Sequence, residues 1–220
     1  MTKPSKTAKP TGSAADFIPP RPTLAKLRAA SKSCQGCDLF KLGTQTVFGE
    51  GPGNAHVMVV GEQPGDMEDR EGHPFIGPAG RILDQALDEA GIDRARTYVT
   101  NAVKHFKWEP RGKRRLHKTP AQREIEACYQ WLEGEMAAVR PAVIVALGAT
   151  AAKVLLGPRF RITQSRGQVQ SREGLPDVIA TYHPSYLLRL KGRPGEEEAY
   201  GQFVDDLRMA ARYLQDKSDK

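Results

Sequence analysis

Four short apolar segments, separated by polar or helix-forming stretches, constrain the fold of this chain most strongly. They lie at residues 57–60, 98–103, 143–147 and 178–182. Nearly continuous hydrophobicity of this kind is typical of strands buried on both faces, as in a parallel sheet. Between and after them lie stretches with helical periodicity, at 79–90, 120–139, 149–156 and 196–214. The alternation predicts an α/β domain in which helices cover a central sheet.

The two ends of the chain differ from its interior. Residues 1–22 are rich in Lys, Pro, Thr and Ser and nearly lack large apolar side chains, which predicts a disordered basic tail. No shift in composition divides the interior, so we expect one domain over residues 23–216 and a polar C-terminal tail at 217–220. The alternative is a pair of smaller lobes.

The charge balance bears on partners rather than on fold. With 33 Lys and Arg against 26 Asp and Glu, the formal net charge is +7, which favours a polyanionic partner but also serves solubility. No apolar run approaches the roughly 18 residues of a membrane span. The N-terminus also lacks the apolar segment of a secretion signal. We therefore expect a cytoplasmic protein, and a monomer because no apolar seam repeats along its surface.

Polar residues follow three of the four predicted strands. The loops after the first, second and fourth strands carry Gly61, Glu62, Gln63, Gly65 and Asp66; Asn101; and His183 and Ser185. Ligands of open α/β sheets bind beyond the carboxyl ends of the strands, so these loops are expected to form one site. The first loop also fits an ordinary Gly-Pro turn, and it matches neither nucleotide-binding glycine motif. Phe75 is predicted near the same crevice, although core packing is the commoner role of Phe.

A strongly basic segment follows the second strand. Seven of the fifteen residues in 104–118 are Lys or Arg, and aromatic and histidine side chains are interleaved with them. Basic residues hold phosphates and aromatic rings stack on unpaired bases, which indicates a nucleic-acid contact. A solvated basic loop is the alternative.

The three cysteines suggest a metal site more than a disulfide, because their number is odd and the expected compartment is reducing. Cys34 and Cys37 have C-x-x-C spacing, and His105 and Cys128 are the best-placed additional ligands. This donor set suits zinc or an iron–sulfur cluster. Alternatively, two thiols face solvent and Cys128 is buried in a helix.

Several motifs in sequence order resemble the uracil-DNA glycosylase superfamily, and in particular its iron–sulfur family four. The motifs are GEQPGDMED at 61–69, HPFIGPAGR at 73–81, YVTNAVK at 98–104 and HPSYLLR at 183–189. The resemblance implies a three-layer α/β/α sandwich with a four-stranded parallel sheet, a flipped uridine and a structural 4Fe-4S cluster. Its usual ligands are four cysteines, and one of those positions is His105 here, so the implied set is Cys34, Cys37, His105 and Cys128.

The segment 111–118 resembles the KRRIH loop of the UdgX branch, and Gln63 is also similar to that branch. UdgX-type proteins excise uracil and then become covalently joined to the abasic sugar through a loop histidine, which corresponds to His117. The resemblance implies that His183 donates to uracil O2. Because attack by the histidine leaves an imidazolium, we expect a nearby carboxylate, Glu62 or alternatively Asp66, to take its proton. The implied substrate contacts are Gly61, Gln63, Gly65, Phe75, Asn101 and Ser185. The implied DNA contacts are Lys113, Arg114, Arg115 and Lys118.

Uracil-containing DNA is thus the expected partner, with single strands accepted and free uracil released. Two alternatives remain. In an ordinary turnover glycosylase, His117 is only a phosphate contact. In a noncatalytic module, the pocket binds uracil DNA reversibly and releases no base.

Overall fold

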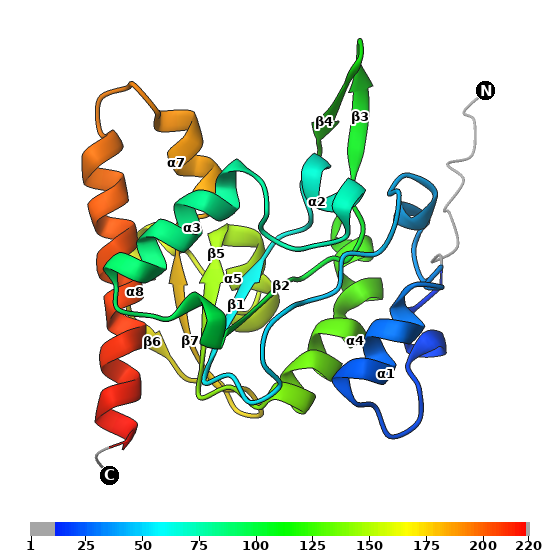
Figure 1. The fold of residues 1–220 in the computed structure, drawn as a ribbon, viewed down its shortest axis with the longest axis horizontal. Helices are drawn as coiled ribbons and strands as arrows, with labels where there is room; N and C mark the ends of the chain where they lie inside the picture. Colours follow the sequence, from blue (N-terminus) through cyan, green and yellow to red (C-terminus); the bar gives the residue numbers. More distant parts are fainter. Residues whose placement is uncertain (1–11, 219–220) are drawn as a thin grey trace, which may run out of the picture.

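The computed structural model describes residues 12–218. At their centre is a five-stranded sheet of order β2-β1-β5-β7-β6 (Figure 1). The four parallel strands are β1 (Val57–Gly61), β2 (Thr97–Asn101), β5 (Val143–Leu147) and β7 (Asp177–Thr181). They confirm the predicted strands. The expected number of four is wrong by one, because β6 (Val169–Gln170) adds an antiparallel edge. Two partly exposed residues carry too little apolar signal to be recognised from sequence.

Helices cover both faces of the sheet, which gives the three-layer α/β/α fold (Figure 1). Along β1, Val57 and Val59 face one layer while Met58 and Val60 face the other, as strand geometry requires. The first layer contains α3 (Pro78–Glu89), α7 (Pro184–Leu190) and α8 (Glu196–Ser218). The second contains α4 (Gln122–Val139) and α5 (Gly148–Leu156), and α1 (Leu24–Ser31) packs against α4.

The basic segment forms a hairpin instead of a loop. Strands β3 (Trp108–Arg111) and β4 (Arg114–His117) pair antiparallel and project beyond the sheet (Figure 1). Gly112 is at the first of the two turn positions with φ +58°, a backbone conformation that glycine adopts without strain. The shorter elements are α2 (Asp66–Glu71), α6 (Ile162–Ser165) and the 3-10 turns Ala14–Phe17, Asp38–Lys41 and Arg94–Arg96.

The ends of the domain extend beyond the predicted boundaries. Residues 1–11 of the expected tail lie outside the described residues, but within 12–22 Ala14 is fully buried, and Phe17 and Ile18 pack on the same apolar cluster. This part of the tail prediction is wrong because these few apolar side chains suffice to anchor the segment. Helix α8 also passes the expected end and reaches Ser218. No helix within residues 12–218 has the length and apolarity needed to cross a membrane.

Candidate active site

The carboxyl ends of β1, β2 and β7 bring Glu62, Asn101 and His183 to one edge of the sheet, as expected from the sequence. The hairpin adds His117, the last residue of β4, whose Nε2 lies 3.4 Å from Glu62 Oε1. Thr150 near the start of α5 donates its hydroxyl hydrogen to the other oxygen, Oε2. The Glu62 carboxylate therefore lies between an imidazole and a hydroxyl.

An unpaired polar atom is buried at the carboxyl ends of β1 and β2. Within residues 12–218, Asn101 Oδ1 is the one buried side-chain nitrogen or oxygen without a hydrogen-bond partner. Gly61 lies beside it, since a Cβ placed there would be 2.3 Å from Asn101 Oδ1 and 2.7 Å from Phe75 Cζ. A buried acceptor without a partner is costly, so its persistence indicates a site that a ligand's N–H completes.

Phe75 is held in an unusual conformation beside Gly61. Its φ of +58° is rare for a large side chain, and the first turn of α3 packs on its carbonyl so closely that Gly80 has no room for a Cβ. The Phe75 ring lies 6.4 Å from the His183 ring, with 31° between their planes. Local strain that packing enforces is typical of functional sites.

His183 caps α7 and is fixed in one tautomer. Its Nδ1 accepts the backbone N–H of Ser185 at 3.1 Å and lies 2.8 Å from the Ser185 hydroxyl. Burial lowers the pKa of His183 to about 4, and the positive charges of His117 and Arg189 act in the same direction. The neutral ring therefore carries its proton on Nε2, where it is available to a ligand. The hydroxyl and backbone N–H of Ser185 thus fix the orientation of the His183 ring.

His117 is also held neutral, although half of its side chain is exposed. Partial burial lowers its pKa and Arg189 adds to this effect, whereas the Glu62 carboxylate opposes it. A neutral imidazole next to a carboxylate is a nucleophile with a proton acceptor at hand. Arg189 was not among the expected site residues, although it is one helical turn beyond Ser185 on α7.

Gln63, an expected substrate contact, hydrogen-bonds to the backbone of the hairpin. Its Nε2 donates to the carbonyls of Lys107 and Lys118 at 3.2 and 3.1 Å, and its Oε1 accepts from the N–H of Lys107 at 3.1 Å. Because Lys107 and Lys118 flank the two strands, Gln63 fastens the base of the hairpin. Gly65 similarly caps α2, where its Cα faces the Glu68 carboxylate.

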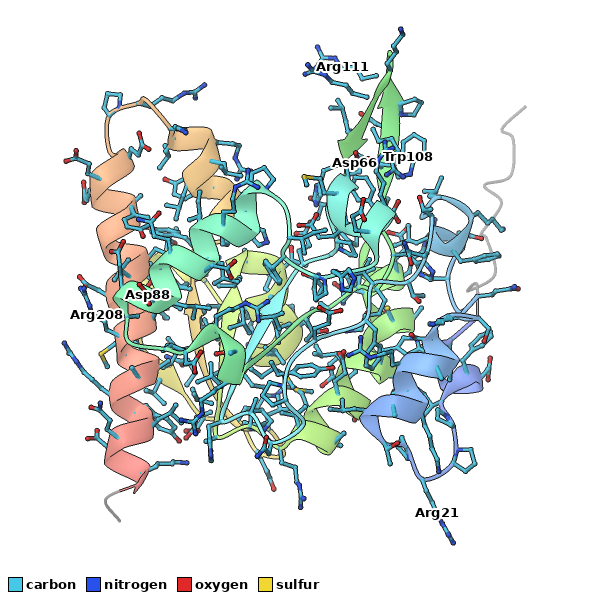
Figure 2. All side chains as sticks on the ribbon, viewed as in Figure 1. Arg21, Asp66, Asp88, Trp108, Arg111 and Arg208 are labelled. Carbon is cyan, nitrogen blue, oxygen red and sulfur yellow. The ribbon has the colours of Figure 1, made fainter. Side chains whose placement is uncertain are left out.

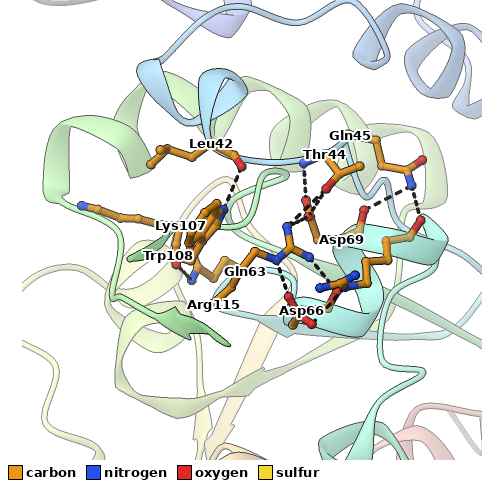
Figure 3. Close-up of polar contacts among 10 residues, drawn as sticks. Leu42, Thr44, Gln45, Gln63, Asp66, Asp69, Lys107, Trp108 and Arg115 are labelled. Atoms are coloured by element: carbon orange, nitrogen blue, oxygen red, sulfur yellow. Dashed lines mark hydrogen bonds and ion pairs between the residues drawn. The ribbon is translucent and has the colours of Figure 1, made fainter. Parts of the chain in front are cut away.

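Arg115 is not a free phosphate ligand, contrary to expectation. It pairs with Asp66 and with Asp69, whose Oδ2 is 2.6 Å from Arg115 Nη1 (Figure 3). Its guanidinium also lies over the rings of Phe106 and Trp108, at 5.4 and 5.5 Å from their centroids. Asp66 is correspondingly occupied by Arg115 and Arg70, so it is not available to His117. The sequence spacing does not predict these ion pairs between Arg115 of the hairpin and the aspartates of α2.

The remaining basic residues of the hairpin are exposed. Lys113 and Arg114 are at its turn, next to Arg111, which Figure 2 shows at the outer end. Lys118 forms an ion pair of 3.0 Å with Glu109 across the hairpin. The hairpin thus presents cations at its tip and His117 at its base.

A model of the uracil DNA glycosylase superfamily matches residues 48–208. The chain belongs to this superfamily. It is 42% identical over 159 residues to a type-4 uracil-DNA glycosylase of Thermotoga maritima, covering 72% of this chain and 79% of that protein. It is 36% identical over 193 residues to a type-4 uracil-DNA glycosylase of Pyrobaculum aerophilum, covering 84% and 92%. A type-5 uracil-DNA glycosylase of the same organism is 31% identical over 189 residues, covering 78% and 80%.

The three cysteines belong to an apolar cluster that includes Trp131 of α4, and Cys128 alone among them lies within the residues matched by the superfamily model. All three are buried free thiols in one cluster, so the alternative of solvent-facing thiols is wrong. Trp131 Nε1 donates to Cys34 Sγ at 3.2 Å, and the Lys104 N–H donates to Cys128 Sγ at 3.3 Å. His105 is buried as well, beside Gly43. In the described part of the chain, no three His, Cys, Asp or Glu side chains are grouped tightly enough for a single metal ion.

Proposed function

We propose that this protein excises uracil from DNA and then becomes covalently attached to the abasic sugar through His117. The observation that carries the proposal is the pair of His117 and Glu62, whose side chains are 3.4 Å apart at the same edge of the sheet as the unpaired amide oxygen of Asn101. Base excision is supported by membership of the superfamily and by the activity named for its type-4 relatives.

Uracil recognition begins with Asn101. Its buried Oδ1 accepts the N3–H of a flipped uracil, and its amide nitrogen donates to O4. Cytosine presents an acceptor and an amino group at these positions and is rejected by the same amide. Phe75 stacks on the flipped ring. A site that hydrogen-bonds the correct base penalises the wrong one strongly, because its own buried groups are then left unpaired.

Bond cleavage separates charge between base and sugar. The bond from C1′ to uracil N1 breaks, its electron pair moves onto the base, and the sugar becomes an oxocarbenium ion. The Nε2–H of His183 donates to uracil O2 and stabilises the departing anion. A neutral imidazole suffices for this role because only a hydrogen bond is donated.

Covalent capture follows from the position of His117. A nitrogen of its neutral ring bonds to C1′ of the cation, which forms an imidazolium, and the Glu62 carboxylate takes the proton from the other ring nitrogen. The product is a neutral N-alkyl imidazole, which is a poor leaving group. The choice of Glu62 over Asp66 as the acceptor is supported by the ion pairs of Asp66 with Arg115 and Arg70. Lys113 and Arg114 hold the neighbouring phosphates, while Arg115 and Gln63 keep the hairpin in place.

The three cysteines and His105 are proposed to hold a 4Fe-4S cluster. The donor chemistry fits, since the three thiols are buried together among apolar side chains and two of them already accept N–H hydrogen bonds. A four-iron cluster is larger than a single ion and requires ligands that are farther apart. The cluster would join the segment of Cys34 and Cys37 to α4 and stabilise the domain.

Covalent capture is tested by mixing the protein with a labelled uracil-containing single strand and heating in SDS. A slower band that His117→Ser loses supports the proposal, and His56→Ser, on the exposed surface, is the matched control. Alkali-labile abasic sites without a band would leave an ordinary turnover glycosylase. Neither signal would leave a binding module.

The cluster is tested separately on protein purified without air. Iron and acid-labile sulfide in equal amounts, lost together in Cys128→Ser, are expected. Zinc without sulfide would overturn the assignment.

A further inference from the structure

The Glu62 carboxylate is held from two sides. Thr150 donates a hydrogen bond to Oε2, while Oε1 faces His117 Nε2 at 3.4 Å. The Thr150 contact is the closer of the two, so the Thr150 hydroxyl fixes the orientation of the Glu62 carboxylate plane. A carboxylate side chain without such a contact rotates among several orientations, and only some of them direct an oxygen at the imidazole.

The position of Thr150 is set by the fold. Strand β5 pairs with both β1 and β7, and α5 begins directly at its end. Thr150 is in the first turn of α5, where backbone N–H groups lack helical partners and favour a nearby anion. The β-branched side chain has few rotamers, so its hydroxyl is directed with little loss of entropy.

Thr150 contacts both Glu62 and a hollow in the protein. Its side chain lines a hollow of about 650 Å³ between α4 and α5, together with Thr119, Pro120 and Lys153. Without the Thr150 hydroxyl, Oε2 accepts its hydrogen bond from water in this hollow. The carboxylate then gains an alternative orientation that points away from His117.

We propose that Thr150 is a positioning residue for covalent capture: its hydroxyl orients the Glu62 carboxylate toward the His117 ring. The inference rests on the proposed function and extends it to a residue outside the expected site. Thr150 touches neither the base nor the sugar, so it acts on the transfer of the imidazolium proton and not on recognition of uracil.

The experiment compares Thr150→Val with Thr150→Ser. Valine keeps the branched shape and removes the hydroxyl, whereas serine keeps the hydroxyl. Thr163→Val, on the exposed surface of α6, is the control for the substitution itself. Single-turnover rates of uracil release and of SDS-stable capture are measured for each variant with the same single-stranded oligonucleotide.

Thr150→Val is expected to capture about tenfold more slowly relative to its own rate of uracil release, the size expected for one hydrogen bond to a charged group. Thr150→Ser is expected to restore the ratio to within about twofold of the wild type. A purely structural role would lower both rates together and would not be rescued by serine. In a Glu62→Gln background, Thr150→Val is expected to add little, because both changes act on the same contact.

Three outcomes are decisive. An unchanged ratio in Thr150→Val, in a wild type that captures DNA, overturns the positioning role and leaves the proposed function standing. Equal losses in the valine and serine variants also overturn it. Absence of capture in the wild type overturns the proposed function itself and is recognised without any Thr150 variant.

Discussion

Gly61 and the Asn101 side chain approach so closely that a β-carbon on Gly61 would lie 2.3 Å from Asn101 Oδ1. The same carbon would be 2.7 Å from Phe75 Cζ. Glycine is therefore required at the end of β1 by the space that the Asn101 amide and the Phe75 ring occupy. Because Gly61 has no side chain, the Asn101 amide and the Phe75 ring can both approach the end of β1.

Gly61→Ala is expected to lower uracil release at least about 100-fold, a loss typical of a misplaced hydrogen-bonding group in an active site. The Asn101 amide is the end of a side chain and turns aside, so the domain still folds while the reading geometry is lost. Gly201→Ala, on α8 with open space around it, is the control. Release of free uracil and thermal unfolding are measured together, and normal excision by Gly61→Ala would refute this view of the pocket.

Arg189→Gln is expected to move the acid limb of covalent capture to higher pH. The positive charge of Arg189 disfavours the imidazolium forms of His117 and His183 and helps to keep the pKa of each below its ordinary value. Removing the charge raises both pKa values, so less neutral His117 is present at mildly acid pH. Capture is measured between about pH 5 and pH 8.

Arg193→Gln, just beyond the end of α7, is the control for lost positive charge. It should leave the profile of capture against pH unchanged at a fixed salt concentration. A profile for Arg189→Gln that moves toward lower pH would contradict the electrostatic role of Arg189.

The parallel strands are predictable from the sequence because both of their faces are buried, and the same argument places Glu62, Asn101 and His183 together. The hairpin gives no such signal, since five of the eight residues of β3 and β4 are exposed. The choice of Glu62 over Asp66 depends on Arg115, whose pairing with α2 only the folded chain reveals. Thr150 was missed because the end of the third predicted strand carries no charged or aromatic residue.

Arg115→Lys is expected to slow covalent capture about tenfold or more, with uracil release less affected. Lysine cannot reach both Asp66 and Asp69 while lying flat on Phe106 and Trp108, so the hairpin that carries His117 loosens. Arg212→Lys, exposed on α8, is the control for the substitution and should behave like the wild type. The ratio of capture to release is measured at one salt concentration, and equal ratios for the two variants would show that Arg115 does not position His117.

A buried ion pair supports the pocket from within the domain. Lys104 Nζ is 2.5 Å from Glu135 Oε2 and donates to the Thr100 hydroxyl and the Asn101 carbonyl, each at 2.7 Å. Both side chains are almost completely buried, so removing one partner leaves an uncompensated charge. Glu135→Leu is expected to lower the free energy of unfolding by about 3–5 kcal/mol.

The double variant Lys104→Met with Glu135→Leu removes both charges and is expected to recover part of this loss. Recovery is incomplete because the Gly49 N–H and the Tyr98 hydroxyl still lose the carboxylate that accepts their hydrogen bonds. Its uracil release should nevertheless remain well below that of the wild type, because the Asn101 carbonyl has lost the lysine that anchors the end of β2. Urea unfolding and release of free uracil separate the two effects. A double variant that is stable and fully active would show that the pair serves stability alone.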